Sequence, residues 1–364
     1  MFSNLKIKSN NNEKSVNLRF FLNRQMINIA IIGYGYWGPN LLRNFNANAH
    51  CNVKYLVDGR EDRLKIAKNQ YPNIETVTNI ESIIQDPNLH AVVIATPVFT
   101  HFELAKLALE HGKHVLIEKP MTSNSKEAQL LIEIAEKKGL LLMVDHTFLY
   151  TGAVQQIKQF IDKNEIGNLQ YFDSTRINLG LIQPDVNVLW DLAPHDLSIL
   201  FYLNNEKPIS VQATGVSHTK NGIENIAYLT INYQSDFIAH FNCSWSSPVK
   251  LRNILIGGDK KMILFNDIEP AEKIKIYDTG FQIKNDEDKR RLLIDYRVGD
   301  IFVPKIDQKE ALQSMAEDFS QGILNKTIPI SNAHKALEVV KVLEAAQISI
   351  KNNGKEVKLE SLWS

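Results

Sequence analysis

Hydrophobic residues in the first half of the chain fall into short runs separated by stretches with helical periodicity. The runs are nearly continuous in apolar residues, which is typical of strands buried on both faces of a parallel sheet. Helices between such strands predict a doubly wound α/β domain, which we place at residues 26–147. The expected strands cover residues 27–32, 53–57, 91–95, 115–117 and 140–144, and the expected helices residues 39–45, 62–69, 100–111 and 126–138.

The pattern changes after about residue 150, where several longer runs alternate apolar and polar residues. Such alternation is typical of antiparallel strands with one exposed face. We therefore expect residues 148–364 to form an α+β domain on a large, open and mostly antiparallel sheet. The expected strands cover residues 169–176, 209–216, 226–233, 237–245, 254–256, 262–265 and 274–277, and the expected helices residues 154–163, 309–324 and 333–350.

The composition narrows the class of partner. Lys and Arg together number 41 and so do Asp and Glu, so the basic excess of a nucleic-acid binder is missing. The two cysteines form no disulfide framework and no zinc-type cluster, which suits a reducing compartment. No apolar run approaches the roughly 20 residues that span a bilayer. We expect a cytoplasmic protein with a small-molecule ligand and no metal, nucleic-acid or membrane partner.

Residues 1–25 differ from the rest because Asn, Ser and Lys dominate them. Their apolar patch at residues 20–22 is flanked by Arg19 and Arg24, whereas a signal peptide needs an uninterrupted apolar stretch of about 7–15 residues. We interpret the segment as a disordered extension, or as extraneous sequence upstream of a true start at Met26. A transit peptide is the alternative.

A glycine motif follows the first expected strand. Gly33, Gly35 and Gly38 have the spacing G-x-G-x-x-G between a strand and a helix, which is the context of a dinucleotide-binding turn. The first glycine permits the turn, the second lets the backbone approach a pyrophosphate, and the third lets helix and strand pack closely. Asp58, at the end of the second expected strand, is placed to bind the ribose hydroxyls and favours NAD over NADP.

Lys119 ends a buried strand, and the carboxyl ends of parallel strands face the ligand crevice. We expect its amine near the reacting group of a substrate. Pro120 restrains the backbone of Lys119 to an extended conformation and makes a cis peptide bond conceivable. The alternative is a solvated lysine at a strand end.

Asp191 and His195 form a second candidate pair. Because proline belongs in the first turn of a helix, Pro194 predicts a helix that begins near Asp191 with this residue as its N-cap. The positive end of the helix dipole would keep His195 neutral, as a general base requires. The alternative is a capping aspartate with an incidental histidine, and we expect Asp196 to be solvated or capping.

Several other residues have two open interpretations. His101 and His146 are structural or contact the cofactor, and Trp37 stacks near the cofactor or simply packs. Trp245 is most simply a sheet residue. Arg176, Lys250 and Arg252 contact an anionic part of the substrate or lie at the surface.

The motifs together resemble the Gfo/Idh/MocA family of oxidoreductases. The similarity extends over nearly all of the chain from Met26 onward and is carried by residues 32–38, 91–97 and 112–120 and by Asp191 with His195. The resemblance implies a Rossmann domain followed by a domain whose open sheet commonly mediates homodimers or homotetramers. It also implies catalytic roles for Lys119, Asp191 and His195. The residues that it places at the cofactor are Gly33, Gly35, Tyr36, Trp37, Gly38, Asp58, Thr96, Pro97, His101, Glu118 and Lys119.

One departure from the family concerns the substrate. Many members carry a glycine-rich stretch before the Asp-x-x-x-His pair, whereas this chain has Asn-Val-Leu-Trp at residues 187–190 after the segment 178–185. Residues 145–150 and 190–196 are most similar to members of nucleotide-sugar and surface-polysaccharide pathways.

We therefore hypothesise an NAD(P)-dependent oxidoreductase that moves a hydride between nicotinamide and a secondary hydroxyl or keto carbon of a sugar. A nucleotide-activated sugar is the expected substrate. The alternatives are an inositol or free-sugar dehydrogenase, an NAD-dependent glycosidase with transient oxidation, and a non-catalytic NAD-binding sensor.

Overall fold

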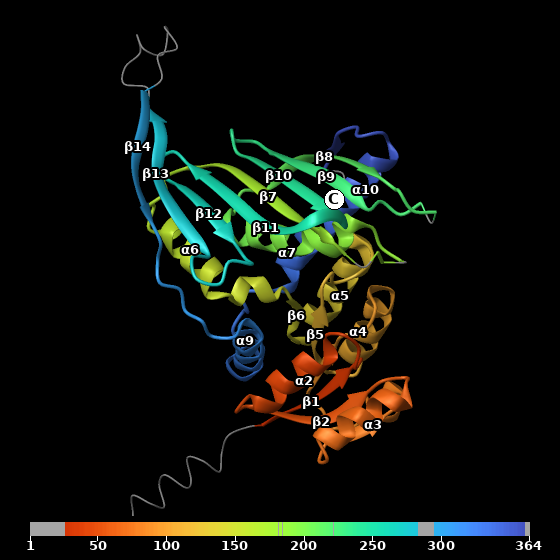
Figure 1. Cartoon of the computed structure of the whole chain (residues 1–364). Coiled ribbons are helices and arrows are strands. Elements are labelled where there is room, and N and C mark those ends of the chain that lie inside the picture. Colours follow the sequence, from red (N-terminus) through yellow and green to blue (C-terminus); the bar gives the residue numbers. More distant parts are fainter. Residues whose placement is uncertain (1–25, 181, 184, 221, 283–294, 361–364) are drawn as a thin grey trace, which may run out of the picture.

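The computed structural model describes residues 26–180, 182–183, 185–220, 222–282 and 295–360. The interpretation of residues 1–25 as an extension lies outside these ranges, as do Leu181 and Pro184. The described chain contains two sheets, which Figure 1 shows one above the other. The predicted division into residues 26–147 and 148–364 remains a prediction, although each sheet lies within one of these parts.

The first sheet has six parallel strands in the order β3-β2-β1-β4-β5-β6. This order confirms the predicted doubly wound fold, and the order reverses between β1 and β4, which is where such folds bind ligands. The short edge strand β3 was not predicted. The bounds are β1 Ile27–Ile32, β2 Cys51–Val57, β3 Glu75–Val77, β4 Ala91–Ile94, β5 His114–Glu118 and β6 Leu142–Asp145, with helices α2 Gly38–Ala47, α3 Glu61–Gln70, α4 His101–Glu110 and α5 Ser125–Lys138.

The second sheet has nine strands in the order β14-β13-β12-β11-β7-β10-β9-β8-β15. All neighbours are antiparallel except β7 and β10, which confirms the predicted mostly antiparallel sheet. Sequence analysis missed β14 and β15. The bounds are β7 Leu169–Leu179, β8 Pro208–Val216, β9 Ile226–Tyr233, β10 Ile238–Ser244, β11 Ser246–Gly258, β12 Met262–Asn266, β13 Ile274–Gln282, β14 Asp295–Phe302 and β15 Val357–Lys358.

Helices connect the two sheets. In Figure 1, α6 (Gly152–Asp162), α7 (Val188–Leu203) and α10 (Ala333–Lys351) lie between the large sheet and the first sheet. Helix α10 packs on β8 and α7 on one side and on α5 and β6 on the other, and α9 (Ala311–Asn325) packs on α2. Helix α10 therefore contacts both sheets and holds α7 opposite the carboxyl ends of the parallel strands.

Candidate active site

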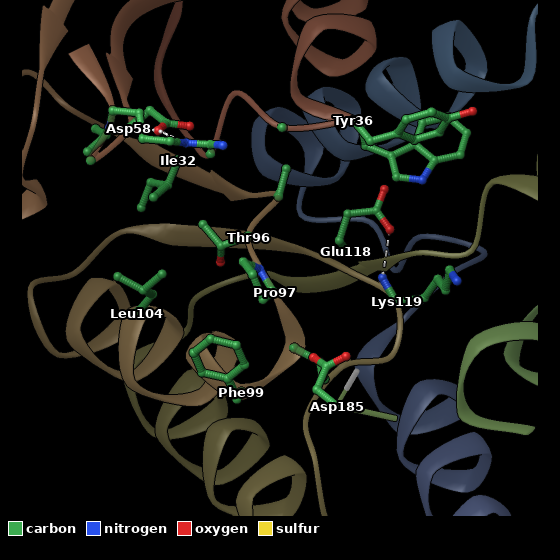
Figure 2. Close-up of a pocket in the computed structure, with 18 of the residues that line it drawn as sticks. Ile32, Tyr36, Asp58, Thr96, Pro97, Phe99, Leu104, Glu118, Lys119 and Asp185 are labelled. Atoms are coloured by element: carbon green, nitrogen blue, oxygen red, sulfur yellow. Dashed lines mark hydrogen bonds and ion pairs between the residues drawn. The ribbon is translucent and has the colours of Figure 1, made fainter. Parts of the chain in front are cut away.

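A cavity of about 1150 Å³ opens at the carboxyl ends of β1, β2, β4 and β5. Figure 2 shows Asp58 at one end of it, Glu118 and Lys119 at the other, and Thr96 and Pro97 between them. The side chains of Gln183, Asp185, Val186, Trp190 and Asp191 line it from the second half of the chain. The cavity is therefore shared between the parallel sheet and the segment that leads into α7.

The glycine turn leaves room for a ligand. Gly33 has a φ of 96°, and a Cβ atom there would lie 2.5 Å from the Ala95 carbonyl oxygen. A Cβ on Gly38 would overlap the carbonyl oxygen of Gly33, so the helix does pack tightly on the turn. Gly35 lines the cavity, and a Cβ there would meet only Arg63, 3.3 Å away. These three positions fit the spacing requirements of a dinucleotide-binding turn.

Asp58 is buried and held in place at the end of β2. Its Oδ2 accepts a hydrogen bond from the backbone N–H of Tyr34 at 2.7 Å, and its Oδ1 accepts one from the backbone N–H of Arg60 at 2.9 Å. Arg63, which sequence analysis did not single out, donates to the Tyr34 carbonyl at 3.0 Å. The carboxylate thus has a fixed orientation at the cavity wall before any ligand arrives.

Lys119 reaches across the cavity to helix α7. Its peptide bond to Pro120 is cis, as the sequence made conceivable. The ammonium donates to the Asp191 carbonyl oxygen at 3.0 Å and lies 3.6 Å from Asp191 Oδ1, while the backbone N–H of Lys119 donates to Glu118 Oε2 at 3.0 Å. The alternative of a solvated lysine is wrong, because its side chain is mostly buried against a specific partner.

Helix α7 begins earlier than predicted. It starts at Val188, and the Asn187 side chain caps it by accepting hydrogen bonds from the backbone N–H groups of Leu189 and Trp190. Asp191 is therefore not the N-cap, and Pro194 lies inside the helix, where it lacks the N–H that would donate to the Trp190 carbonyl. The prediction failed because Asn187 offers a better cap than Asp191 and the helix tolerates one missing hydrogen bond.

His195 consequently lies about two turns into the helix, beyond the range of its dipole. Burial, followed by the positive charges of Lys119 and Arg176, holds the pKa of His195 well below its usual value. The imidazole is neutral at pH 7 as expected, but for a different physical reason. The Phe148 ring packs edge-on at 4.9 Å, and Nδ1 is buried with no hydrogen-bond partner among the described residues.

Asp196 is neither solvated nor a cap. Only 1% of it is exposed, and it forms a two-pronged ion pair with Arg176, with Nη2–Oδ1 at 2.6 Å and Nε–Oδ2 at 2.9 Å. Ser174 donates to the same carboxylate at 2.7 Å. The surface role considered for Arg176 is therefore wrong. The pair joins β7 to α7 across 20 residues, a contact that local sequence patterns do not reveal.

Two buried carboxyl groups meet beside Lys119. Glu118 and Asp145 end the neighbouring strands β5 and β6 in direct register. Burial, followed by the charge of Asp145, raises the pKa of Glu118 well above its usual value, and burial also raises the pKa of Asp145. The pair therefore retains a proton more readily than exposed carboxylates do. Sequence analysis missed Asp145 as a partner, although the adjacent strand ends give the signal.

Trp245 is more than a sheet residue. It follows β10, is 2% exposed, and its indole Nε1 donates to Asp191 Oδ2 at 3.0 Å. With this bond made, Oδ1 is the oxygen that faces Lys119. Arg252 is partly exposed, lies 3.3 Å from Asp267 and does not line the cavity, so both of its interpretations stay open.

The structure brings together most of the predicted cofactor contacts. Tyr36, which is 87% exposed, lies at the cavity with Thr96, Pro97, Glu118 and Lys119 in Figure 2, and Trp37 also lines the cavity. Gly38, His101 and His195 do not line the cavity. His101 is buried, with ring nitrogens 2.8 Å from the Thr96 carbonyl and 2.9 Å from the Pro120 carbonyl, so its structural interpretation holds.

Within the ranges that the structure describes, no three metal-ligating side chains cluster. No described helix is both long enough and apolar enough to cross a membrane.

A six-stranded doubly wound sheet with a glycine turn, joined to a large antiparallel sheet, defines a two-domain dinucleotide-binding protein. The model described as "Oxidoreductase family, NAD-binding Rossmann fold" matches residues 27–146, and the "GFO/IDH/MocA C-terminal domain" matches residues 154–264. The chain belongs to the Gfo/Idh/MocA oxidoreductase family, as the resemblance implied, and its first domain is an NAD-binding Rossmann domain.

Several curated relatives have named activities, among them an inositol dehydrogenase and a nucleotide-sugar dehydrogenase. Over 226 residues the chain is 27% identical to the NADP(+)-dependent scyllo-inositol 2-dehydrogenase IolW of Bacillus subtilis, an alignment that covers 57% of this chain and 60% of that protein. Over 209 residues it is 28% identical to the UDP-N-acetylglucosamine 3-dehydrogenase of Acidithiobacillus ferrooxidans, covering 56% and 63%. The chain thus spans less than two thirds of the length of either relative.

A solved structure covers almost the whole fold. The oxidoreductase from Agrobacterium radiobacter, crystallised with NAD+, L-tartaric acid and magnesium, superposes with a TM-score of 0.76 at 16% identity and covers 92% of this chain and 99% of that one. At this identity the likeness shows the fold.

Proposed function

We propose that this chain is an NAD-dependent oxidoreductase that interconverts a secondary hydroxyl and a keto group on a sugar. The observation that carries the proposal is the contact between Lys119 and Asp191 at one end of a cavity whose other end is a dinucleotide-binding turn. The Lys119 amine and the Asp191 carboxylate meet at the place where a nicotinamide ring would lie, and the neutral imidazole of His195 follows one turn after Asp191 on the same helix.

NAD is the proposed cofactor rather than NADP. Asp58 lines the cavity and is bonded to the glycine turn through the backbone N–H of Tyr34, and a carboxylate there accepts hydrogen bonds from the ribose hydroxyls and repels a 2′-phosphate. Arg60 is the counter-signal, since its Nε lies 3.4 Å from Asp58 Oδ1. Because the Arg60 guanidinium is already paired with the Asp58 carboxylate, its attraction for a 2′-phosphate is weaker.

His195, Lys119 and Asp191 have different roles in the proposed reaction. His195, kept neutral by burial, accepts the hydroxyl proton. Lys119 stabilises the negative charge that develops on the substrate oxygen. Asp191 orients Lys119 and binds a neighbouring hydroxyl. NAD supplies the hydride acceptor when bound, so the protein contributes placement and electrostatics.

A nucleotide-activated sugar is the proposed substrate. Gln183 and Asp185 also line the cavity, whose volume of about 1150 Å³ leaves space for a group attached to the sugar ring. The named activity of the Acidithiobacillus relative also supports this class. The named activity of the Bacillus relative favours an inositol or free sugar instead, so this remains the second candidate.

The test is a spectroscopic screen of the purified protein against nucleotide sugars, free sugars and inositols with NAD and NADP. We expect accumulation of NADH with one nucleotide sugar and a higher kcat/KM with NAD than with NADP. Sugar cleavage without net NADH would indicate the glycosidase alternative. Tight NAD binding with no turnover of any substrate would contradict the proposal and favour the sensor.

A further inference from the structure

A second cavity, of about 400 Å³, lies further along the helix that carries Asp191. Its walls come from α6, from α7, from the residues after β6, and from residues 328–332 with the first turn of α10. None of its lining residues also lines the first cavity. Small-molecule sites occupy roughly 300–1,000 Å³ and combine an apolar wall with a few polar groups, so this cavity is large enough for an organic ligand.

The inner end of the cavity carries a buried polar group without a partner. His146 lines it and is 2% exposed, and neither ring nitrogen has a hydrogen-bond partner among the described residues. Burial, followed by the charge of Lys119, lowers the pKa of His146 to about 3. The neutral ring has one donor and one acceptor nitrogen. Because an unpaired buried polar group is costly, a ligand hydroxyl at this end would be stabilising.

Apolar side chains separate this inner end from the solvent. Leu149 and Phe201 are both 2% exposed, and the Tyr202 ring lies nearer the surface. Ile328, which is 83% exposed, marks the outer rim. A flat, apolar body such as an aromatic ring fits between these side chains, since burying its surface is favourable.

The outer end of the cavity carries positive charge. Lys158 and Lys335 line it, with side chains 20% and 36% exposed, and no carboxylate is among its described lining residues. Their carboxylate partners, Asp162 and Glu338, lie outside the lining. Each ammonium has three donors and can bind a second anion. A cavity mouth lined by one sign of charge favours a ligand of the opposite sign.

We propose that this cavity binds a small organic anion, an aromatic carboxylate with a hydroxyl group at its far end. The hydroxyl bonds to His146, the ring packs against Phe201 and Tyr202, and the carboxylate binds Lys158 and Lys335. An organic cation would meet two positive charges, and a purely apolar ligand would leave His146 without a partner. The site goes beyond the proposed function, because it does not require the chain to oxidise a sugar.

The site lies on the same face of α7 as the first cavity. Ser198 lines the second cavity and follows Asp191 by seven residues, which is about two helix turns. Its hydroxyl donates to the His195 carbonyl at 2.7 Å. The two cavities therefore share one helix but no lining residue, so we expect the anion and NAD to bind at the same time.

The test is isothermal titration calorimetry of the full chain, saturated with NAD, using p-coumarate as the probe. We expect one p-coumarate to bind per chain. Cinnamate, which lacks the hydroxyl, should bind about 3–10-fold more weakly, the effect of one neutral hydrogen bond. Methyl p-coumarate, which lacks the charge, should bind at least about 10-fold more weakly, because hydrogen bonds to charged groups are stronger.

Two variants assign the two ends of the probe. His146→Phe keeps a ring without nitrogens, so p-coumarate should bind it only as well as cinnamate does, while the affinity for cinnamate stays constant. Lys335→Glu should weaken p-coumarate about 10-fold and leave methyl p-coumarate nearly unchanged. Lys351→Glu, the same change at an exposed position at the far end of α10, is the control and should match the wild type.

Three results would overturn the site. These are no binding of p-coumarate at millimolar concentration, displacement of p-coumarate by NAD, and binding that neither His146→Phe nor Lys335→Glu weakens. Far-UV circular dichroism establishes that both variants are folded. Wild-type chain that binds p-coumarate but turns over no sugar would sink the proposed function alone, whereas normal turnover without p-coumarate binding would sink only this site.

Discussion

At the scale of single residues, the site depends on how Asp191 is held. Lys119 approaches it from β5 and binds its backbone carbonyl, while Trp245 donates to Oδ2 from the far side. Two backbone hydrogen bonds hold Trp245 in turn. Its N–H donates to the Asn225 carbonyl, and its carbonyl accepts from the N–H of Gly180. The Asp191 carboxylate is therefore held with Oδ2 bonded to Trp245 and Oδ1 facing the Lys119 ammonium, so little reorganisation is needed during the reaction.

Replacing Lys119 by Ala removes the amine without touching the glycine turn. We expect kcat to fall about 10²–10⁴-fold, because one charge-stabilising or proton-transfer group is lost. The affinity for NAD should change little, which quenching of tryptophan fluorescence can report, since Trp37 and Trp190 line the cavity. Wild-type turnover in this variant would remove Lys119 from the mechanism, whereas a large loss of NAD affinity would make it a cofactor ligand instead.

The variant Trp245→Phe removes the hydrogen bond to Asp191 and keeps an aromatic ring in its place. A lost hydrogen bond to a charged group is worth about 1.5–3 kcal/mol, so kcat should fall roughly 10–100-fold. The KM for NAD should stay constant, since Trp245 does not line the cavity. Steady-state kinetics at saturating substrate provide the measurement. An unchanged kcat in a folded variant would show that Asp191 needs no orientation.

At the scale of elements, strand β5 links stability at one end with chemistry at the other. His114 begins the strand and its Nδ1 accepts a hydrogen bond from the backbone N–H of Leu141 at 2.8 Å, while Glu118 and Lys119 lie at the cavity end. The first end requires a neutral imidazole acceptor, because a protonated ring cannot accept this bond.

The pH dependence of stability follows from His114. Burial, with a smaller effect of His90, lowers its pKa to about 4. The unfolded chain binds this proton near pH 6.5 and the folded chain only near pH 4, so acid favours unfolding between these values. His114→Asn keeps an acceptor but does not titrate. We expect the free energy of unfolding of the wild type to fall relative to the variant by up to about 1.4 kcal/mol per pH unit.

Urea unfolding of both proteins at pH 7, 5.5 and 4.5 measures this difference. Parallel pH dependences would mean that the imidazole titrates normally in the folded state.

At the scale of the whole molecule, the large sheet has one face without helices of the described chain (Figure 1). Strand registers place Tyr228, Ile238 and Leu255 on that face, and all three are exposed, whereas alternate residues such as Ala239 are fully buried. Exposed apolar side chains gathered on one sheet face suggest an interface. We propose that this face forms the homodimer or homotetramer that the family resemblance implied.

Leu255→Asp places a charge on this face, where burial in an interface would be costly. We expect the mutant to elute as a smaller species than the wild type in size-exclusion chromatography with light scattering. Ile66→Asp, an equally apolar and exposed position on α3, is the control and should keep the wild-type mass. A monomeric wild type, or a Leu255→Asp variant of unchanged mass, would rule out this interface.

Much of the architecture was predictable from local patterns. Continuous apolar runs gave the parallel strands and alternating runs gave the antiparallel sheet, because burial on two faces or one face imposes these periods. Short edge strands such as β3 and β15 were missed, since their few residues carry no period. The start of α7 was misplaced, because the cap that Asn187 provides competes with the preference of Pro194 for a first turn.

The sequence alone determined the class of each sheet, the glycine turn and the position of Lys119 at a strand end, because the periods and motifs that predict them involve residues that are neighbours along the chain. Tertiary structure alone decided that Arg176 pairs with Asp196, that Trp245 holds Asp191, and that His146 faces a cavity of its own. These contacts join residues 20 to 54 positions apart or segments of different domains. Burial and electrostatics set them, and both act through space rather than along the chain.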